Sequence, residues 1–193
     1  IHNAIPIIGD AKRGDVGNTA QAYARALFDF FGFDAVTVNP YLGSDSVAPF
    51  LEYQEKGIFV LCRTSNPGAA DFQDLTLGEE RRPLYELVAE WARERNRSGN
   101  VGLVVGATYP EELNRVRQLC PGIVLLIPGV GAQGGDLDLA VRYGVDSQGE
   151  RAIINSSRQI IYASADKDFA LAAPKAAMEL QYSINKSRSP LTS

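Results

Sequence analysis

The sequence predicts an α/β fold built around a sheet of parallel strands. Six short runs are almost continuously apolar, and stretches with helical periodicity alternate with them along the 193 residues. Strands that are apolar at nearly every position are typical of parallel sheets covered on both faces. The predicted strands are residues 5–9, 35–39, 58–62, 101–107, 123–128 and 152–156.

The stretches that follow these strands have the spacing of amphipathic helices. In one of them Leu84, Leu87, Val88 and Trp91 fall at positions i, i+3, i+4 and i+7. We expect this stripe to face the core. The predicted helices are residues 19–32, 46–56, 83–96, 110–119, 137–143 and 168–184.

Six βα units fit two architectures, a doubly wound open sheet or a (β/α)₈ barrel that lacks two units. Such barrels usually run to about 250 residues, and two further units of about 30 residues each would bring the chain to that length. The sequence also begins IHNAIPIIGD, without Met, and reaches a strand-like run almost at once. We therefore expect a TIM barrel whose third to eighth units form one domain, residues 1–185, with residues 186–193 as a tail.

Composition and charge exclude several classes of protein. A net charge of −4 and a pI near 5.1 argue against a nucleic-acid-binding protein, which is expected to be basic. No apolar run approaches the length of a membrane span, so no membrane partner is expected. Cys62 and Cys120 form neither a metal motif nor a disulfide framework, which favours the cytoplasm. The sole histidine, His2, argues against a Ser-His-Asp mechanism and a His-rich metal site.

Two loops after late strands have the composition of a phosphate site. The loop after residues 123–128 reads PGVGAQGGD, and its glycines let backbone N–H groups approach an anion closely. The loop after residues 152–156 supplies Ser157 and Arg158, and arginine binds phosphate in a planar, bidentate manner. In the barrel these are the seventh and eighth strands, whose loops often bind phosphate. The alternative is a helix-capping turn.

The segment of residues 63–83 is long for a connector and has no clear periodicity. Long connections of this kind in compact domains are often active-site lids. We therefore expect a lid here, and the alternative is a surface excursion without a function.

Asp10, Lys12 and Asp15 directly follow the first apolar run. If residues 5–9 form a strand, Asp10 and Lys12 lie at its end and point to the same side. TIM barrels carry catalytic residues at this end of their strands. A lysine beside carboxylates keeps its proton, because opposite charges favour the charged form, so Lys12 is expected to donate a proton. The alternative is a solvated charge cluster in a loop.

These segments resemble a known family. DAKRGDVGNT resembles the Asp-x-Lys-x-x-Asp signature of orotidine 5′-phosphate decarboxylases, which stands at the end of their third barrel strand. TSNPG, PGVGAQGGD and NSSR are similar to later segments of the family, and VNPYLGSDS to its longer, bacterial-type branch. The resemblance runs from about residue 5 to about residue 165. The first motif is shared across a wider superfamily, whereas the combination is far more specific.

The resemblance implies decarboxylation of orotidine 5′-phosphate to UMP in pyrimidine biosynthesis, without a cofactor or metal. Lys12 would protonate C6 of the pyrimidine after CO₂ leaves, while Asp10 would lie against the departing carboxylate and hold Lys12. Ser65 would bond to the pyrimidine ring. The phosphate would be held by Gln133, Ser157 and Arg158.

The resemblance also implies a homodimer with shared active sites. Asp15 and Thr19 would reach into the neighbouring subunit's site and contact the ribose end of the substrate. For Lys12 and Asp15 to serve different sites, we expect the chain to turn outward at Gly14, where a residue without Cβ is permissive. The family also uses an Asp of its first strand and a Lys of its second, and neither is found in this sequence.

Two other functions fit the residues. A sugar-phosphate decarboxylase or synthase of the same superfamily resembles the chain in the first motif, but such enzymes use Mg²⁺ and lack a pyrimidine pocket. The second alternative is a truncated nucleotide-binding chain without activity. Ser65 and the GAQGG segment favour the nucleotide decarboxylase.

Overall fold

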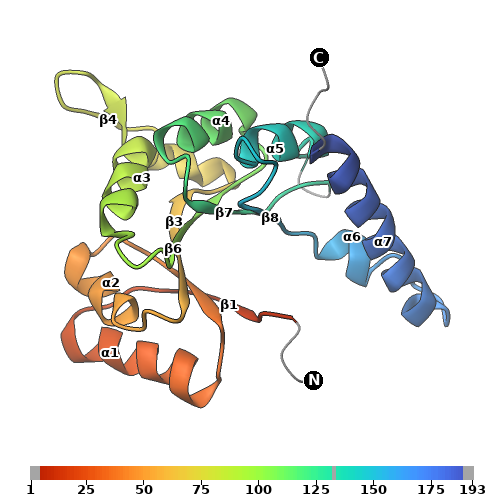
Figure 1. Ribbon diagram of the computed structural model, residues 1–193, viewed down its shortest axis with the longest axis horizontal. Helices are drawn as coiled ribbons and strands as arrows, with labels where there is room; N and C mark the ends of the chain where they lie inside the picture. The colour runs from red at the N-terminus through yellow and green to blue at the C-terminus, as the bar shows by residue number, and fades with distance from the viewer. Residues whose placement is uncertain (1–4, 132–133, 189–193) are drawn as a thin grey trace. The chain divides into compact units, whose positions relative to one another are not determined.

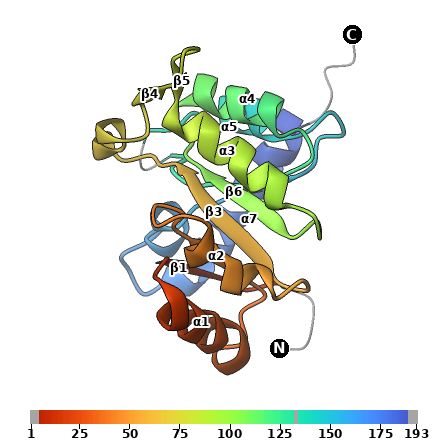
Figure 2. The same cartoon turned by 90° about the vertical axis from the view of Figure 1, so that its left-hand side faces the viewer.

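In the computed structural model, which describes residues 5–131 and 134–188, strands alternate with helices in the predicted order (Figures 1 and 2). The main strands are β1 (Ile8–Arg13), β2 (Ala35–Val38), β3 (Gly57–Arg63), β6 (Val101–Val105), β7 (Val124–Ile127) and β8 (Ala152–Ile154). The helices are α1 (Gly17–Arg25), α2 (Ser44–Leu51), α3 (Leu84–Arg95), α4 (Pro110–Leu119), α5 (Leu137–Gly144), α6 (Arg158–Ile161) and α7 (Phe169–Arg188). A π-helical stretch (Ala26–Phe30) continues α1.

Contacts divide the chain into two compact units, and the first contains residues 1–62 and 70–104. In this unit β1, β2, β3 and β6 are neighbours in chain order, and β2 runs parallel to both β1 and β3. All four residues of β2 are buried, as expected for a strand with partners on both sides. Helices α1 and α2 lie side by side (Figure 1), and Phe28 packs edge to face on Phe50 with ring centroids 6.3 Å apart.

The second unit contains residues 63–69 and 105–193. Strands β7 and β8 run parallel, with Leu125 opposite Ala152 and Ile127 opposite Ile154. Helix α5 contacts both α4 and α7, and α7 also contacts the short α6 (Figure 1). Leu125, Leu126 and Ile127 of β7 are buried together with Ala140 and Val141 of α5, so the helix covers the strand as in a βα unit.

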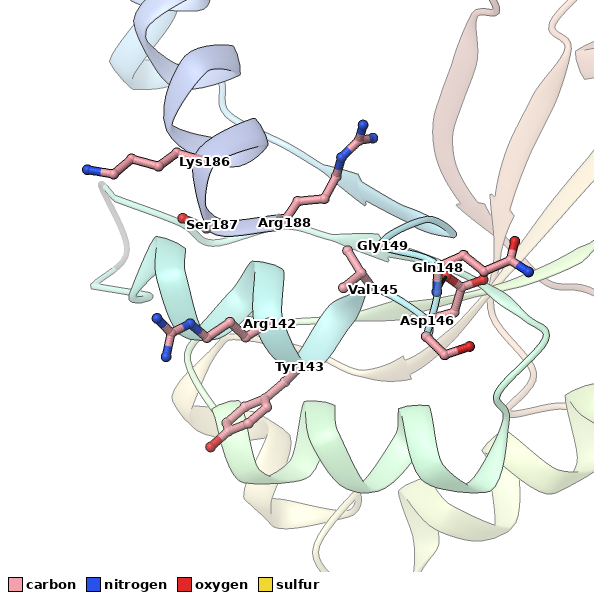
Figure 3. Close-up of a pocket in the computed structure, with 10 residues that line it drawn as sticks. Arg142, Tyr143, Val145, Asp146, Gln148, Gly149, Lys186, Ser187 and Arg188 are labelled. Carbon is pink, nitrogen blue, oxygen red and sulfur yellow. Dashed lines mark hydrogen bonds between the residues drawn. The ribbon is translucent and has the colours of Figure 1, made fainter. Parts of the chain in front are cut away.

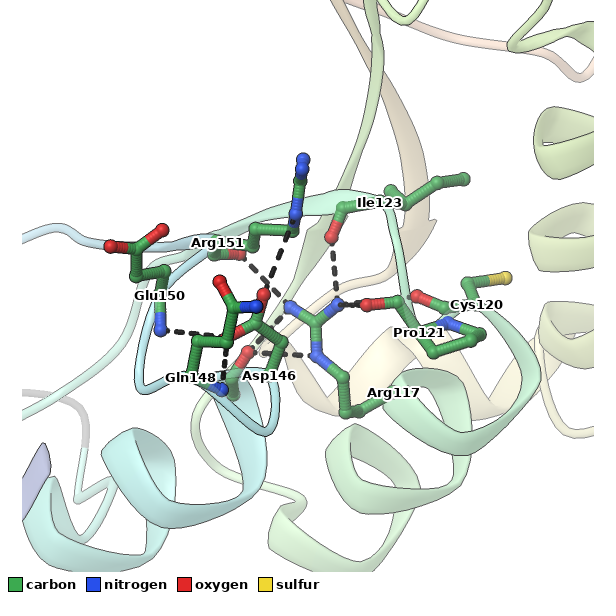
Figure 4. Close-up of polar contacts among 9 residues, drawn as sticks. Arg117, Cys120, Pro121, Ile123, Asp146, Gln148, Glu150 and Arg151 are labelled. Atoms are coloured by element: carbon green, nitrogen blue, oxygen red, sulfur yellow. Dashed lines mark hydrogen bonds and ion pairs between the residues drawn. The ribbon is translucent and has the colours of Figure 1, made fainter. Parts of the chain in front are cut away.

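A buried arginine joins three elements of the second unit (Figure 4). Arg117 in the last turn of α4 is 8% exposed, and burial lowers the pKa of its guanidinium. Its Nε and Nη2 donate to the carbonyl of Gly144 at the end of α5, at 3.0 and 2.6 Å, and Nη2 also donates to that of Arg151 at 2.9 Å. Nη1 donates to the carbonyls of Cys120, Pro121 and Ile123. The guanidinium therefore satisfies carbonyls that helix ends leave without intrahelical partners.

The first strand differs from the prediction in its position. We expected residues 5–9, but β1 begins at Ile8 and continues to Arg13, so Asp10 and Lys12 lie inside it rather than after it. Gly9 pairs with Val36 and Arg13 with Val38, so four steps along β1 oppose two steps along β2. The apolar pattern missed residues 10–13 because they are mostly polar. They nevertheless belong to the strand, because they form a bulge and pairing with β2 resumes after it at Arg13.

The buried face of α3 also differs from the prediction. Leu84, Leu87, Val88 and Trp91 are only half-buried, and Trp91 donates to Ser44 Oγ at 3.3 Å. The fully buried positions include Tyr85, Ala89 and Ala92 instead. The larger apolar side chains thus lie at the border of the buried face of α3. The small Ala89 and Ala92 lie at its centre, where they allow the helix backbone to approach the core closely.

The predicted lid segment contains regular structure that the sequence pattern did not reveal. It includes a 3₁₀ helix (Pro67–Asp71) and a small antiparallel pair, β4 (Thr76–Leu77) and β5 (Arg82–Pro83). Gly78 and Arg81 adopt positive φ in the turn of this hairpin. Strands of two residues are too short to produce a recognisable hydrophobic period, which is why the sequence did not predict them. That this segment acts as a lid stays a prediction.

Two features near the C-terminus were also missed. Helix α6 is one turn long, and α7 continues to Arg188 rather than ending near residue 184, so it runs into the expected tail. Among the helices of the described residues, none combines the length and apolarity that a membrane span requires.

Candidate active site

Asp10 and Lys12 meet on β1, as their spacing predicts. Lys12 Nζ forms an ion pair with Asp10 Oδ2, and both side chains are more than half exposed. The other carboxylate oxygen, Asp10 Oδ1, accepts a hydrogen bond of 2.9 Å from Thr37 Oγ1 on the neighbouring strand β2. Both oxygens of this carboxylate are therefore held, one by a cation and one by a buried hydroxyl.

The backbone of Lys12 has an unusual conformation, with φ +49°. A residue with a side chain rarely adopts this region, and such residues are concentrated at functional sites. The conformation belongs to the irregular part of β1 between Gly9 and Arg13. Lys12 N–H donates to Thr37 Oγ1 at 2.9 Å, while Arg13 accepts from Asn39 N–H at 2.8 Å. The Thr37 side chain and the Asn39 backbone N–H thus hold the bulge in place.

The pKa of Asp10 lies below its usual value. Burial is the largest single influence and raises this pKa. The hydrogen bonds from Lys12 and Thr37 and the lysine charge act in the opposite direction and together outweigh it. Asp10 is therefore a carboxylate at neutral pH, able to orient an ammonium group.

Asp15 and Thr19 lie after the strand, where α1 begins. Asp15 Oδ1 accepts from Val16 N–H at 2.8 Å, and Thr19 is exposed. The expected outward turn at Gly14 stays a prediction. Gly14 does not have a positive φ, but a Cβ there would lie 2.4 Å from the carbonyl oxygen of Asn39, so the missing Cβ permits a close approach of two backbones.

Ser65 belongs to the second unit, at the end of β3. A Cβ on Gly106 would lie 2.9 Å from both Cβ and N of Ser65, so the glycine makes room for it. Thr108 Oγ1 donates to the Ser65 carbonyl at 3.4 Å. The neighbouring Arg63 is 1% exposed, forms an ion pair with Glu112 and stacks on the ring of Tyr109 at 4.0 Å. Ser65 therefore packs closely on Gly106 and follows an arginine that is buried and ion-paired.

The two predicted phosphate loops come together in the second unit. A small hollow of about 80 Å³ is lined by Pro128, Gly129, Val130, Asn155, Ser156, Ser157, Arg158 and Gln159. Ser157 and Arg158 are exposed at this hollow. Gln133, the third predicted phosphate ligand, lies outside the described residues. Residues of the glycine loop and the cation of the other loop thus line the same small space, which suits an anionic group.

A second hollow of the same unit, about 500 Å³ in volume, lies between the end of α5 and the end of α7. It contains none of the residues predicted for the site. Figure 3 shows that Arg142 and Lys186 extend to the left from different helices, whereas Arg188 extends away from them to the upper right. Because their charges do not converge on one point, we assign this hollow no role in catalysis.

Sequence reasoning missed three polar residues around these groups. Thr37 is 1% exposed within a strand of apolar residues, and a buried polar side chain in such a run requires a partner. That rule could have identified it. Asn155 and Gln159 line the small hollow, and the buried Oδ1 atom of Asn155 has no hydrogen-bond partner among the residues that the structure describes. Their role could not be read from the sequence, since it depends on which two loops meet.

Comparison with known proteins assigns the chain to a family. The model of the orotidine 5′-phosphate decarboxylase / HUMPS family matches residues 1–173. The orotidine 5′-phosphate decarboxylase of Cupriavidus taiwanensis is 54% identical over 188 residues, which are 97% of this chain and 68% of that protein.

Solved structures agree. The OMP decarboxylase of Leishmania donovani has a TM-score of 0.85 at 44% identity, covering 95% of this chain and 69% of its own. The UMP synthase of the same organism has a TM-score of 0.87 at 46% identity, covering 95% of this chain and 40% of its own. These findings confirm the predicted α/β, TIM-barrel fold class and the resemblance to the decarboxylases. The chain belongs to the orotidine 5′-phosphate decarboxylase / HUMPS family.

Proposed function

We propose that this chain decarboxylates orotidine 5′-phosphate to UMP, a step of pyrimidine biosynthesis, without a cofactor. Family membership and 54% identity to a protein named for this reaction support the activity. The observation that carries the mechanism is the ion pair of Lys12 and Asp10 on a strained bulge of β1. It provides an ammonium group in a fixed position and an acid–base pair that needs no histidine.

In the proposed reaction the bond between C6 and the carboxylate breaks, and its electron pair stays on C6 while CO₂ leaves. A proton from Lys12 Nζ then forms the new C6–H bond, and the lysine regains a proton from solvent. The ammonium stabilises negative charge where it develops, which is the most effective place for an electrostatic contribution. Asp10 holds Lys12 in place and lies beside the departing carboxylate.

The substrate phosphate supplies binding energy far from the reacting bond. We assign it to Arg158, Ser157 and Gln133, with backbone N–H groups of the glycine loop, and we assign the pyrimidine ring to Ser65. Binding energy from a remote group can offset the cost of bringing a substrate carboxylate near Asp10. The small hollow that unites the two loops supports this assignment.

We further propose that the enzyme is a cytoplasmic homodimer with shared sites. Asp15 and Thr19 would contact the ribose end of a substrate bound mainly by the neighbouring subunit. Their place after β1, with Asp15 bonded to Val16 rather than to Lys12, supports a separate role. The buried free thiols of Cys62 and Cys120 agree with a reducing compartment.

The decisive experiment is Lys12→Ala in the protein at its native length, assayed for loss of orotidine 5′-phosphate and for UMP binding. Turnover should fall by more than the roughly 10²–10⁴-fold typical of lost general acid catalysis, because charge stabilisation is lost as well. UMP affinity should change little. Lys175→Ala, at an exposed lysine of α7, serves as the matched control and should keep full activity.

The same assay separates the alternatives. Activity that survives EDTA supports the cofactor-free decarboxylase, whereas activity on a sugar phosphate that requires Mg²⁺ would favour the sister enzyme. A Lys12→Ala protein that retains a tenth of the wild-type rate would refute the assignment of Lys12.

A further inference from the structure

Thr37 is a buried polar residue in β2, a strand of the first unit whose residues are all buried. The other residues of β2 are Ala35, Val36 and Val38, and Thr37 is 1% exposed among them. A hydroxyl that is removed from water costs free energy unless it is hydrogen-bonded. The strand could place valine here with a similar volume and without this cost, so the hydroxyl requires an explanation.

Both hydrogen-bonding functions of this hydroxyl are directed at the Asp10–Lys12 pair. The O–H donates to Asp10 Oδ1 at 2.9 Å, and the oxygen accepts from the Lys12 backbone N–H at 2.9 Å. One side chain of β2 therefore contacts the carboxylate that holds the ammonium group and also the backbone from which that ammonium group extends.

The geometry of β1 makes these contacts consequential. Between Gly9 and Arg13 the chain departs from the regular register with β2, and within this stretch the Lys12 N–H donates to the side chain of Thr37. Lys12 also has φ +49°, a conformation that persists only when its surroundings enforce it. The Thr37 oxygen accepts the Lys12 N–H at this point and helps to hold the conformation.

We propose that Thr37 is a positioning residue of the decarboxylase, which acts by fixing the Asp10 carboxylate and the Lys12 backbone so that the Lys12 ammonium meets C6. This inference rests on the proposed function. It extends that function to a residue of a different strand, and it assigns Thr37 no contact with the substrate.

The hydroxyl and the bulk of Thr37 can be separated by two substitutions. Thr37→Val keeps the branched shape but removes both hydrogen bonds, so Asp10 loses a donor and the Lys12 N–H loses its acceptor. Thr37→Ser keeps the hydroxyl and removes only a methyl group. Val36→Ala in the same strand is the matched control for a loss of packing without a polar change.

We expect Thr37→Val to lower kcat by about 10- to 100-fold, the scale at which a misplacement of about 1 Å acts, with KM and UMP affinity nearly unchanged. Thr37→Ser should retain kcat within about threefold of wild type, and thermal unfolding should confirm that the variants are folded. A Thr37→Val protein with wild-type kcat, or a Thr37→Ser protein as slow as Thr37→Val, would overturn the inference.

Crystal structures of the two folded variants provide a readout that does not depend on activity. In Thr37→Val the Asp10 carboxylate or the Lys12 backbone should move from its present position, and in Thr37→Ser both should stay. An unmoved pair in Thr37→Val contradicts the positioning role. If the wild-type protein itself fails to decarboxylate orotidine 5′-phosphate, the proposed function fails, and the structures still decide whether Thr37 positions the pair.

Discussion

Two cations of this protein, Lys12 in the first unit and Arg117 in the second, are held in opposite ways. Lys12 is half exposed, pairs with one carboxylate and lies on strained backbone. Arg117 is buried and donates six hydrogen bonds to neutral carbonyls at the ends of regular elements. A charge that remains accessible can act on a ligand, whereas a charge whose donors are all used can only stabilise the fold.

This difference predicts that the turnover lost by substitution of an accessible site residue can be restored when two variant subunits form a mixed dimer. If Lys12 and Asp15 serve different sites, a Lys12→Ala subunit paired with an Asp15→Ala subunit has one site with both residues native. Random exchange makes half the dimers mixed, so activity should rise from nearly zero to about a quarter of wild type in a two-fold dimer. The measurement is turnover after subunit exchange, with mass spectrometry of differently labelled subunits to confirm mixing. No recovery despite exchange would place Asp15 in its own subunit's site.

The scaffold cation should behave differently. Arg117→Met removes all six hydrogen bonds and leaves buried carbonyls unsatisfied, so we expect a loss of about 3–5 kcal/mol of unfolding free energy. The kcat of the remaining folded protein should be unchanged, and mixing with another variant should not restore the stability. Arg142→Met, at an exposed position of the neighbouring helix α5, should stay within about 0.5 kcal/mol of wild type in urea unfolding. Equal losses for the two variants would show that the carbonyl contacts contribute little.

The contrast between the two cations also shows what the sequence could predict. The strands were predicted because parallel strands buried on both faces read as continuous apolar runs, as in Val124–Ile127. The boundary of β1 was missed because pairing with β2 continues through a polar bulge. Asp10 and Lys12 were placed together because two residues of one strand suffice to define their side, and the structure brings them into contact.

Thr37 and Arg117 could not be found in the same way. Their partners lie on other elements, up to 34 residues distant for Arg117 and 27 for Thr37. An arginine in the last turn of a helix is expected in solvent, and only the fold shows that its fork faces carbonyls of α5 and of the residue before β8. Polar networks that span several elements depend on topology, which periodicity does not contain.

Arg158 tests whether an exposed cation of the second unit acts on a ligand. It is exposed at the small hollow between the two predicted phosphate loops. Arg158→Ala should weaken UMP binding by on the order of 2–4 kcal/mol, as for a lost charge contact, and leave uridine binding and thermal stability unchanged. Titration calorimetry with both ligands measures this difference. Arg142→Ala, an exposed arginine at the other hollow, is the control. Equal losses for UMP and uridine would show that Arg158 does not recognise the phosphate.

The smallest expected effect is on stability, and it concerns Asp10 beside Lys12 and Asp146 near Arg117. Asp146 pairs with Arg151 at 3.5 Å and feels the charge of Arg117, and its pKa is lowered chiefly by the backbone N–H of Glu150, with further help from that of Gln148. For Asp10, burial raises the pKa, and the contacts with Lys12 and Thr37 outweigh it. The Asp146 side chain is 14% exposed and that of Asp10 is 65% exposed, so solvent screens the contacts of Asp10 more strongly. Asp146 should therefore contribute more to stability than Asp10, although each contribution should stay below about 1 kcal/mol because surface charge pairs are weak.

The direction of the pH dependence follows from these lowered pKa values. A carboxyl group whose pKa is lower in the folded state binds more protons when unfolded, so its stabilisation is present above the ordinary value of 3.8 and is lost as the pH falls through the folded pKa. Urea unfolding at neutral pH and again below 3.8 should show a smaller loss for Asp146→Asn than for wild type, and Asp10→Asn should lie between them. If Asp10→Asn reduced the acid sensitivity more than Asp146→Asn, the site carboxylate would be the stronger stabiliser. The contrast between Lys12, which is accessible, and Arg117, which stabilises the fold, would then not apply to the carboxylates near them.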